Sequence, residues 1–232
     1  MSQSLNQFAW VAGTDDYKFG HRSIANIKIT GAPADTNFTR WAILFDGKDY
    51  RLYFFKGSTK DTLYQFAFNR NTSTYEFGFR SIPELKLTGI PDDASSESFA
   101  MLHDGTTYRL YLRKLGDQAT LYQFGFNPAT SNYEFGHNSI PAIKVTGAPD
   151  DTDWSRWAML HDGSAYRLYA FKLGTNIEFY QAAFNPRAGE YQFGFNSIAD
   201  LDLQDTPKDS NLSDMAMLHD GTDYRLYLKK LD

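Results

Sequence analysis

The stretch Asp104-Gly-Thr-Thr-Tyr-Arg-Leu-Tyr111 decides the fold, because the chain carries it in four copies. The pattern Asp-Gly-x-x-Tyr-Arg-Leu-Tyr begins at Asp46, Asp104, Asp162 and Asp220. A second pattern, Tyr-x-Phe-Gly-x-x-Ser-Ile, begins at Tyr17, Tyr75, Tyr133 and Tyr191. Both series advance in equal steps of 58 residues, as from position 46 to position 104. A fixed period of this length predicts four copies of one supersecondary unit.

Composition and charge exclude several classes of protein. The chain has 23 basic and 28 acidic residues, a net charge of −5, and a mild acidic excess does not suit a nucleic-acid binder. It has no cysteine, which excludes disulfides, thiolate zinc sites and cysteine nucleophiles. No apolar window of about 18 residues is present to span a membrane. No secretory signal is visible in the first residues, so a cytoplasmic or non-classically exported protein is expected.

One repeat is interpreted as a meander of antiparallel strands. The pair Asp104-Gly105 is a strong hairpin signal between two runs rich in large and aromatic residues. In this second copy we expect four short strands, over residues 99–103, 108–114, 121–127 and 133–137.

The segment that follows, 139–147, has two interpretations. Ser139 is suited to cap a single helical turn with Pro141 in its first positions, and we favour this one. Ile143 and Val145 also alternate as they would in a brief extra strand. The stretch 148–155 is polar and is expected to be a loop that returns to the next unit.

Four small meanders that repeat radially and close end to end predict an all-β fold, a four-bladed β-propeller. Leu5 and Gln7 stand one period before Leu63 and Gln65, so the N-terminal segment is expected to pair as a strand of the last blade. We expect a single domain over residues 1–232, with repeats 8–65, 66–123, 124–181 and 182–232 plus 1–7. Two tandem β-sandwich domains and an up-and-down barrel are the competing architectures.

The repeat resembles that of hemopexin-type four-bladed propellers. The resemblance rests on the second-strand sequence Tyr53-Phe-Phe-Lys-Gly57 and on an alanine in the preceding inner strand, at Ala42, Ala100, Ala158 and Ala216. It implies the blade architecture for the whole chain. The disulfide that ties the first and last blades in that family cannot form here, because there is no cysteine. We therefore transfer the architecture and not the haem-binding or protease-associated roles.

The chain offers few candidates for catalysis or metal binding. One histidine column is replaced by Phe45 in the first copy, so ring packing or hairpin hydrogen bonding is favoured over a metal site at His103, His161 and His219. An arginine present in every copy is interpreted as structural, at Arg51, Arg109, Arg167 and Arg225. A recurring aspartate is expected to cap the loops, at Asp35, Asp93, Asp151 and Asp209. We expect no enzymatic activity and no cofactor, with a cation in a loop or in the central channel as the alternative.

The columns where the copies stop agreeing are the candidate ligand-binding residues. Arg40-Trp41 recurs as Arg156-Trp157, two periods later, while the other two copies differ. Tryptophan and arginine together suit the recognition of sugars or planar ligands, although Trp41 and Trp157 also fit as packing residues between blades. The candidates are Phe38, Arg40, Trp41, Trp154, Arg156, Trp157 and Asp214.

The function predicted from these observations is non-enzymatic and lectin-like. Inter-blade loops would recognise a glycan or another small ligand, and several similar sites would raise avidity. A hemopexin-like scaffold that binds another protein and a carrier with a metal or haem in its channel are the alternatives. No nucleic-acid or membrane partner is expected.

Overall fold

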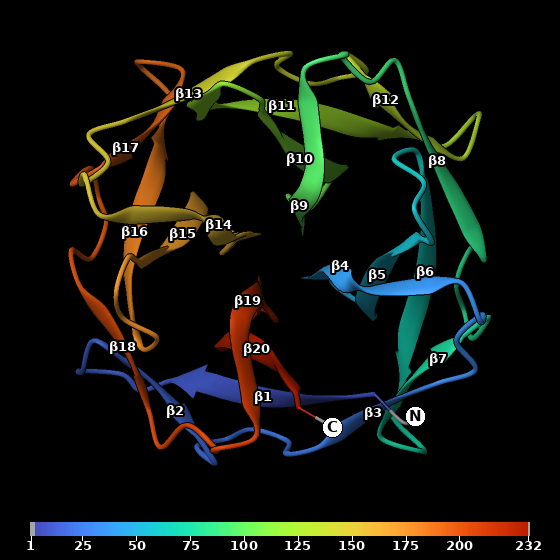
Figure 1. Ribbon diagram of the computed structural model, residues 1–232, viewed down its shortest axis with the longest axis horizontal. Coiled ribbons are helices and arrows are strands. Elements are labelled where there is room, and N and C mark those ends of the chain that lie inside the picture. Colours follow the sequence, from blue (N-terminus) through green and yellow to red (C-terminus); the bar gives the residue numbers. More distant parts are fainter. Residues whose placement is uncertain (1–2, 232) are drawn as a thin grey trace.

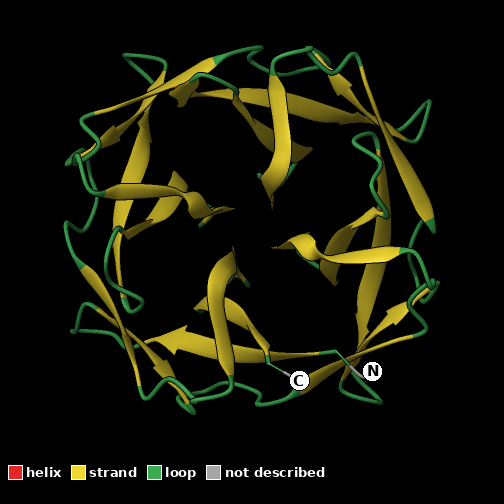
Figure 2. Cartoon of the chain, in the orientation of Figure 1, coloured by secondary structure: helices red, strands yellow, loops and turns green. Residues whose placement is uncertain are grey.

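The chain forms an all-β structure in which 20 strands join into one ring-like sheet (Figure 1). The computed structural model describes residues 3–231. Within these residues every regular element is a strand (Figure 2). The same residues contain no helix long and apolar enough to cross a membrane.

Sixteen of the strands form four antiparallel units of four strands each. In each unit the first strand is the innermost one and the fourth is the outermost (Figure 1). The first unit contains β4 (Thr36–Phe45), β5 (Tyr50–Lys56), β6 (Thr62–Asn69) and β7 (Thr74–Phe77). The second contains β9 (Ala94–His103), β10 (Tyr108–Lys114), β11 (Asp117–Asn127) and β12 (Asn132–Phe135). The third contains β14 (Thr152–His161), β15 (Tyr166–Lys172), β16 (Glu178–Asn185) and β17 (Glu190–Phe193). The fourth contains β19 (Ser210–His219), β20 (Tyr224–Lys230), β1 (Ser4–Trp10) and β2 (Asp16–Phe19).

The four strands expected in the second repeat are confirmed, but each unit is followed by a fifth, bridging strand. The bridging strands are β3 (Ile27–Thr30), β8 (Glu84–Thr88), β13 (Ile143–Thr146) and β18 (Leu201–Gln204). Each pairs antiparallel with the third strand of its own unit and parallel with the last strand of the next. The helical turn favoured for 139–147 is therefore wrong. The segment 143–146 is a strand because it pairs with an edge of each of two neighbouring units. Its side chains alternate between two faces, and Ile143 and Val145 lie on the buried one.

The first strand of the chain completes the unit that contains the last strand. β1 pairs antiparallel with β20 from Leu5 opposite Lys229 to Ala9 opposite Arg225. Its other edge pairs with β2 and β3. The expected pairing of the N-terminal segment with the last repeat is thus observed, and the outer strands form an unbroken ring (Figure 1).

Four apolar clusters fill the junctions between neighbouring units. The alternation of β5 illustrates how one strand serves two clusters. Leu52 and Phe54 pack into the junction with the fourth unit, whereas Tyr53 and Phe55 pack into the junction with the second. Each small sheet is therefore covered on both faces by its neighbours. This explains why large apolar residues occupy both the odd and the even positions of a strand.

The first strand of every unit carries a β-bulge at its N-terminal end. In β4 the register with β5 shifts between Asn37 and Trp41, and in β14 the register with β15 shifts between Asp153 and Trp157. The stretch 148–155 is therefore not all loop, because β14 begins at Thr152. The divergent columns fall within this bulge, and a bulge re-aims side chains without ending the strand.

The histidine column lies where the four innermost strands meet. His103, His161 and His219 line a cavity of about 10 Å³ together with Phe45, which is about the volume that one water molecule needs. The ring of His103 packs on Tyr108 at 4.6 Å, and its Nδ1 accepts a hydrogen bond from the backbone of Gly105. The packing and hairpin role predicted for this column is confirmed. Within residues 3–231, no group of three or more His, Asp or Glu side chains is placed to hold a metal ion.

Candidate binding site

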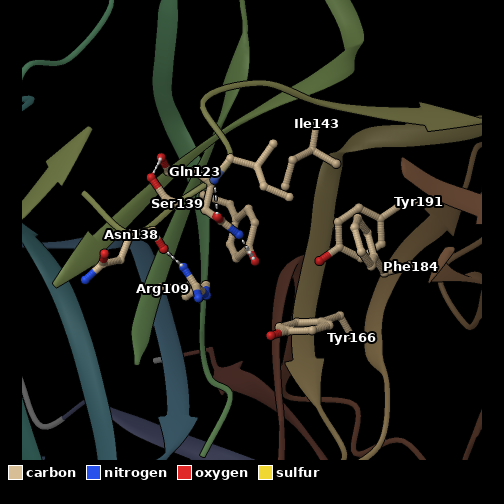
Figure 3. A pocket seen from close by; sticks show the side chains of 10 residues that line it. Arg109, Gln123, Asn138, Ser139, Ile143, Tyr166, Phe184 and Tyr191 are labelled. Carbon is tan, nitrogen blue, oxygen red and sulfur yellow. Dashed lines mark hydrogen bonds between the residues drawn. The ribbon is translucent and has the colours of Figure 1, made fainter. Parts of the chain in front are cut away.

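Three hollows of similar volume lie between neighbouring units, at the outer side of the second strands. The pocket between the second and third units has a cavity volume of about 440 Å³ (Figure 3). Equivalent pockets of about 460 and 410 Å³ lie at the first–second and fourth–first junctions. These volumes fall in the range of small-molecule binding pockets.

The two sides of the pocket come from different units. Arg109 on β10 and Asn138 in the β12–β13 turn form one wall, and Phe184 on β16 with Tyr191 on β17 forms the other (Figure 3). Tyr166 on β15 lies below Phe184 on the same side of the pocket, and its hydroxyl group points toward Arg109 (Figure 3). The site therefore exists only where two units pack together.

A buried amide–phenol pair forms the floor. Gln123 donates from Nε2 to the hydroxyl oxygen of Tyr111 over 2.6 Å, and its Oε1 accepts from the backbone nitrogen of Ile140 over 2.8 Å. Both side chains are buried. Both the nitrogen and the oxygen of the Gln123 amide are thus hydrogen-bonded. The bond to Ile140 also fixes the turn between β12 and β13 to β11.

Arg109 connects the hairpin of its own unit to the rim of the pocket. Its Nε donates to Asp104 Oδ2 over 2.7 Å, and its Nη1 donates to the carbonyl oxygen of Asn138 over 2.5 Å. Asn138 has a φ of 42°, a left-handed conformation that asparagine tolerates better than most residues. The arginine therefore holds an otherwise strained turn in place.

The ionisable groups around the pocket have pKa values far from neutral pH. Burial opposes ionisation of Asp104, but hydrogen bonds from Thr106, Thr107 and Arg109 outweigh it and hold the pKa of this carboxyl well below its usual range. Burial raises the pKa of Tyr111 to about 12. Burial, with the nearby Asp104 carboxylate, raises the pKa of Tyr166. The pocket therefore keeps one charge state, with its phenols protonated, across the neutral range.

The same side chains recur by the 58-residue period. The amide–phenol hydrogen bond is repeated with lengths of 2.8, 2.5 and 2.9 Å, in Gln65–Tyr53, Gln7–Tyr227 and Gln181–Tyr169. The arginine columns treated as purely structural from the sequence also line the pockets, at Arg51, Arg109 and Arg225. The sequence interpretation missed these pockets because it sought binding residues only in columns that diverge.

The lining of the pocket suits a neutral polar ligand. It combines guanidinium and amide donors with hydroxyl acceptors and with the apolar surfaces of Ile140, Ile143 and Phe184. The ten lining residues include no carboxylate and no imidazole, the groups that general acid–base catalysis uses most. The arrangement can hold a molecule that presents hydroxyl groups on one side and C–H groups on the other.

Four of the residues predicted from the sequence meet at one end of the central channel. Arg40, Trp41, Trp157 and Asp214 line a smaller cavity of about 180 Å³. Trp157 donates from Nε1 to Ser98 Oγ over 2.8 Å. Both tryptophans are buried in the apolar clusters, so the packing role considered for them is confirmed.

The two predicted arginines use their guanidinium groups within the fold. Arg40 Nη2 donates to the carbonyl oxygens of Gly57 and Thr59, and its guanidinium lies 4.4 Å from the Phe55 ring centre. Arg156 makes hydrogen bonds from Nε, Nη1 and Nη2 and lies 4.6 Å from the ring centre of Phe171. A role of either arginine in ligand binding stays a prediction.

The remaining two predicted residues, Phe38 and Trp154, lie in strands rather than in loops. Phe38 packs edge-on against Phe54 with ring centres 5.1 Å apart. Trp154 packs edge-on against Phe193 at 6.3 Å. Both are partly buried and pack against a junction cluster, and neither lines the channel-end cavity formed by four of the other predicted residues.

Comparison with known proteins finds only distant structural similarity. The sequence matches no protein-family model and no curated protein. Among solved structures, AofleA from Arthrobotrys oligospora is 14% identical, with a TM-score of 0.32 over 81% of this chain and 49% of that one. The SapL1 lectin in complex with alpha methyl fucoside is 13% identical, with a TM-score of 0.35 over 95% and 63%. A mutant of the Aleuria aurantia lectin AAL, in complex with Fucalpha1-6GlcNAc, is 13% identical, with a TM-score of 0.37 over 93% and 68%.

This chain thus spans about half the length of AofleA. Similarity at this level does not identify a ligand for this chain. The hemopexin-type resemblance finds no support in these comparisons.

Proposed function

We propose that this chain is a non-enzymatic, lectin-like protein that binds a sugar residue in the pockets between its units. The carrying observation is the repeated combination of an arginine, a buried amide–phenol pair and the aromatic rings of the next unit. A pyranose has hydroxyl groups for the arginine and apolar C–H groups for the rings. The absence of carboxylate and imidazole from the lining of the second–third pocket favours binding over hydrolysis.

We further propose that the ring is a four-bladed β-propeller and a single domain, with the repeat boundaries given above. In this interpretation the four units are the blades, and β1 supplies the third strand of the last blade. The junction pockets then face outward around one rigid ring. Such an arrangement suits a surface that carries many copies of the same glycan, because each further contact is intramolecular.

The channel-end cavity is proposed as a second, smaller polar site. Trp41 Nε1 and Asp214 Oδ1 are buried there, and neither makes a full hydrogen bond to a described residue, although the two side chains are close enough to interact. A single hydroxyl group placed between them would accept from the indole and donate to the carboxylate. Replacing Trp41 by Phe removes this donor and should weaken only a ligand that enters the channel end.

Blocking the pockets tests the main proposal without removing any of their polar side chains. An isoleucine that is about 40% exposed lines the mouth at Ile24, Ile82 and Ile140. A variant with Ile24→Trp, Ile82→Trp, Ile140→Trp and Ile198→Trp, the last at the equivalent position of the fourth junction, fills the mouths. Its control carries Leu115→Trp and Leu173→Trp, exposed positions that line none of these pockets.

The probes are a panel of methyl glycosides of neutral hexoses and 6-deoxyhexoses, including methyl α-fucoside, measured by calorimetry. We expect the natural chain and the leucine control to bind the same sugar, and the isoleucine variant to lose that binding while it keeps its thermal unfolding. The proposal is wrong if no glycoside binds, or if the filled variant binds as tightly as the natural chain.

A further inference from the structure

The four junction arginines fall into two classes. In the first unit Arg51 donates from Nε to Asp46, from Nη1 to the carbonyl oxygen of Arg80 and from Nη2 to Asp49 Oδ2 at 3.3 Å. Arg225 in the fourth unit repeats this, with Nη2 at 2.9 Å from Asp223 Oδ2. Both outer nitrogens of these two guanidinium groups are engaged within the protein.

We call the carboxylate that accepts a hydrogen bond from Nη2 the clamp, and an arginine or pocket with such a carboxylate clamped. The second and third units lack it. The position of Asp49 is taken by Thr107 in one and Ala165 in the other. Arg109 and Arg167 keep the hydrogen bonds from Nε and Nη1, but no residue among 3–231 accepts a hydrogen bond of ordinary geometry from their Nη2. Both arginines are therefore fixed in position without a carboxylate on Nη2. The Arg109 guanidinium also interacts with the neutral hydroxyl group of Tyr166 in the same pocket, a partner that a sugar hydroxyl displaces more easily than a carboxylate.

A rim residue changes together with the clamp. Arg80 Nη1 lies 3.9 Å from Asp49 Oδ1, and Arg22 lies 3.8 Å from Asp223 in the same way. Where the carboxylate is missing, the rim position holds an asparagine, at Asn138 and Asn196. The two changes are physically linked, because the carboxylate lies between the two guanidinium groups and reduces the repulsion between them.

This pattern differs from the alternation of the channel end. There the first copy resembles the third, as Arg40-Trp41 and Arg156-Trp157 show. Around the pockets the first unit resembles the fourth, and the second resembles the third. The unclamped arginine thus occurs in two neighbouring units, the second and the third, and the two-period recurrence of Arg40-Trp41 does not explain this.

We propose that the pocket at Arg109 and the equivalent position at Arg167 are the high-affinity sugar sites, and that Asp49 and Asp223 weaken the pockets at Arg51 and Arg225 by occupying Nη2 of the arginine. This inference rests on the proposed sugar-binding function. In an unclamped pocket Nη2 donates to a sugar hydroxyl without displacing a carboxylate. In a clamped pocket the sugar must first displace a carboxylate, and losing one charged hydrogen bond weakens binding about tenfold or more.

Exchanging the clamp and rim residues between classes tests the inference. The closed variant carries Thr107→Asp, Asn138→Arg, Ala165→Asp and Asn196→Arg. The opened variant carries Asp49→Thr, Arg80→Asn, Asp223→Ala and Arg22→Asn. Every substitution installs a residue found at the same position of another repeat, so each variant uses side chains that this fold already accommodates.

The readout is the number of tight sites for the best-binding methyl glycoside of the panel, counted by native mass spectrometry and calorimetry. We expect two tight sites in the natural chain, none in the closed variant and four in the opened variant. Four equivalent sites in the natural chain, or a count that the exchanges do not change, overturns this inference and leaves the proposed function standing. If neither the natural chain nor the opened variant binds any glycoside, the proposed function fails and the inference falls with it.

Discussion

Tyr108 donates a hydrogen bond of 3.0 Å from its hydroxyl to Oδ2 of Asp46, the oxygen that also accepts from Arg51. Tyr108 belongs to the second unit and Asp46 to the first. The same contact links every junction, with lengths of 3.1, 3.0 and 3.3 Å in Tyr166–Asp104, Tyr224–Asp162 and Tyr50–Asp220. A phenol of each unit thus holds the hairpin carboxylate of the unit before it, all the way around the ring.

This contact predicts the effect of a small substitution. Tyr108→Phe removes one hydrogen bond to an ionised carboxylate and should lower the free energy of unfolding by about 1–3 kcal/mol. Tyr50→Phe is the matched control, because its hydrogen bond is longer at 3.3 Å and should cost less. Urea denaturation of the two variants measures the difference. Equal and negligible losses would show that the contact does not couple the units.

Ring closure is tested by comparing two equivalent phenylalanines. Phe8 on β1 and Phe66 on β6 stand one period apart, and both are fully buried. If β1 contributes to the fourth unit as β6 does to the first, Phe8→Ala and Phe66→Ala should each lower the free energy of unfolding by about 3–5 kcal/mol. Thermal and chemical unfolding measure both. A Phe8→Ala variant as stable as the natural chain would mean that the closing strand is not part of the cooperative fold.

The hairpin carboxylate Asp220 should lose its contribution to stability only at low pH. Burial opposes ionisation of Asp220, but hydrogen bonds from Asp223, Thr222 and Arg225 outweigh it and lower its pKa to about 2. An unfolded aspartate has a pKa of about 3.9, so this carboxylate stabilises the folded state fully above that pH. Its contribution is lost as the pH falls from about 4 toward 2. Asp220→Asn should reduce the slope of unfolding free energy against pH in that window and leave the slope above pH 5 unchanged.

The histidine column predicts a second change in stability, at a pH above the range in which Asp220 titrates. Burial lowers the pKa of His103, so the unfolded chain binds a proton near pH 6.5 more readily than the folded one. The natural chain should therefore lose stability as the pH falls below about 6.5. His103→Phe installs the residue of the first copy, Phe45, and should be more stable relative to the natural chain at pH 5 than at pH 8. Thermal unfolding at the two pH values measures this, and an equal difference at both contradicts it.

The sequence was sufficient for the repeat, the strands and the pairing of the first strand with the last, because those depend on periodic patterns. It was not sufficient for the bridging strands. Ser139 and Pro141 resemble a helix start locally, yet β13 is a strand because two units offer it free edges. The junction pockets were missed for a related reason. Arg109 looks purely structural in a column without variation, and only the folded ring places the aromatic wall of the next unit opposite it.

Substituting lysine for Arg109 and for Arg51 distinguishes the structural role of the arginine from its role in binding. Arg109→Lys keeps the positive charge, but an ammonium group cannot hold Asp104 and the Asn138 carbonyl with the geometry of a guanidinium fork. Arg51→Lys makes the same change in a clamped pocket and also breaks the contact with Asp49, so it should lose at least as much stability as Arg109→Lys in urea denaturation. Only Arg109→Lys should weaken the binding of the best methyl glycoside, by about tenfold or more at one site. If both variants weaken binding equally, the clamped and unclamped pockets serve the sugar alike.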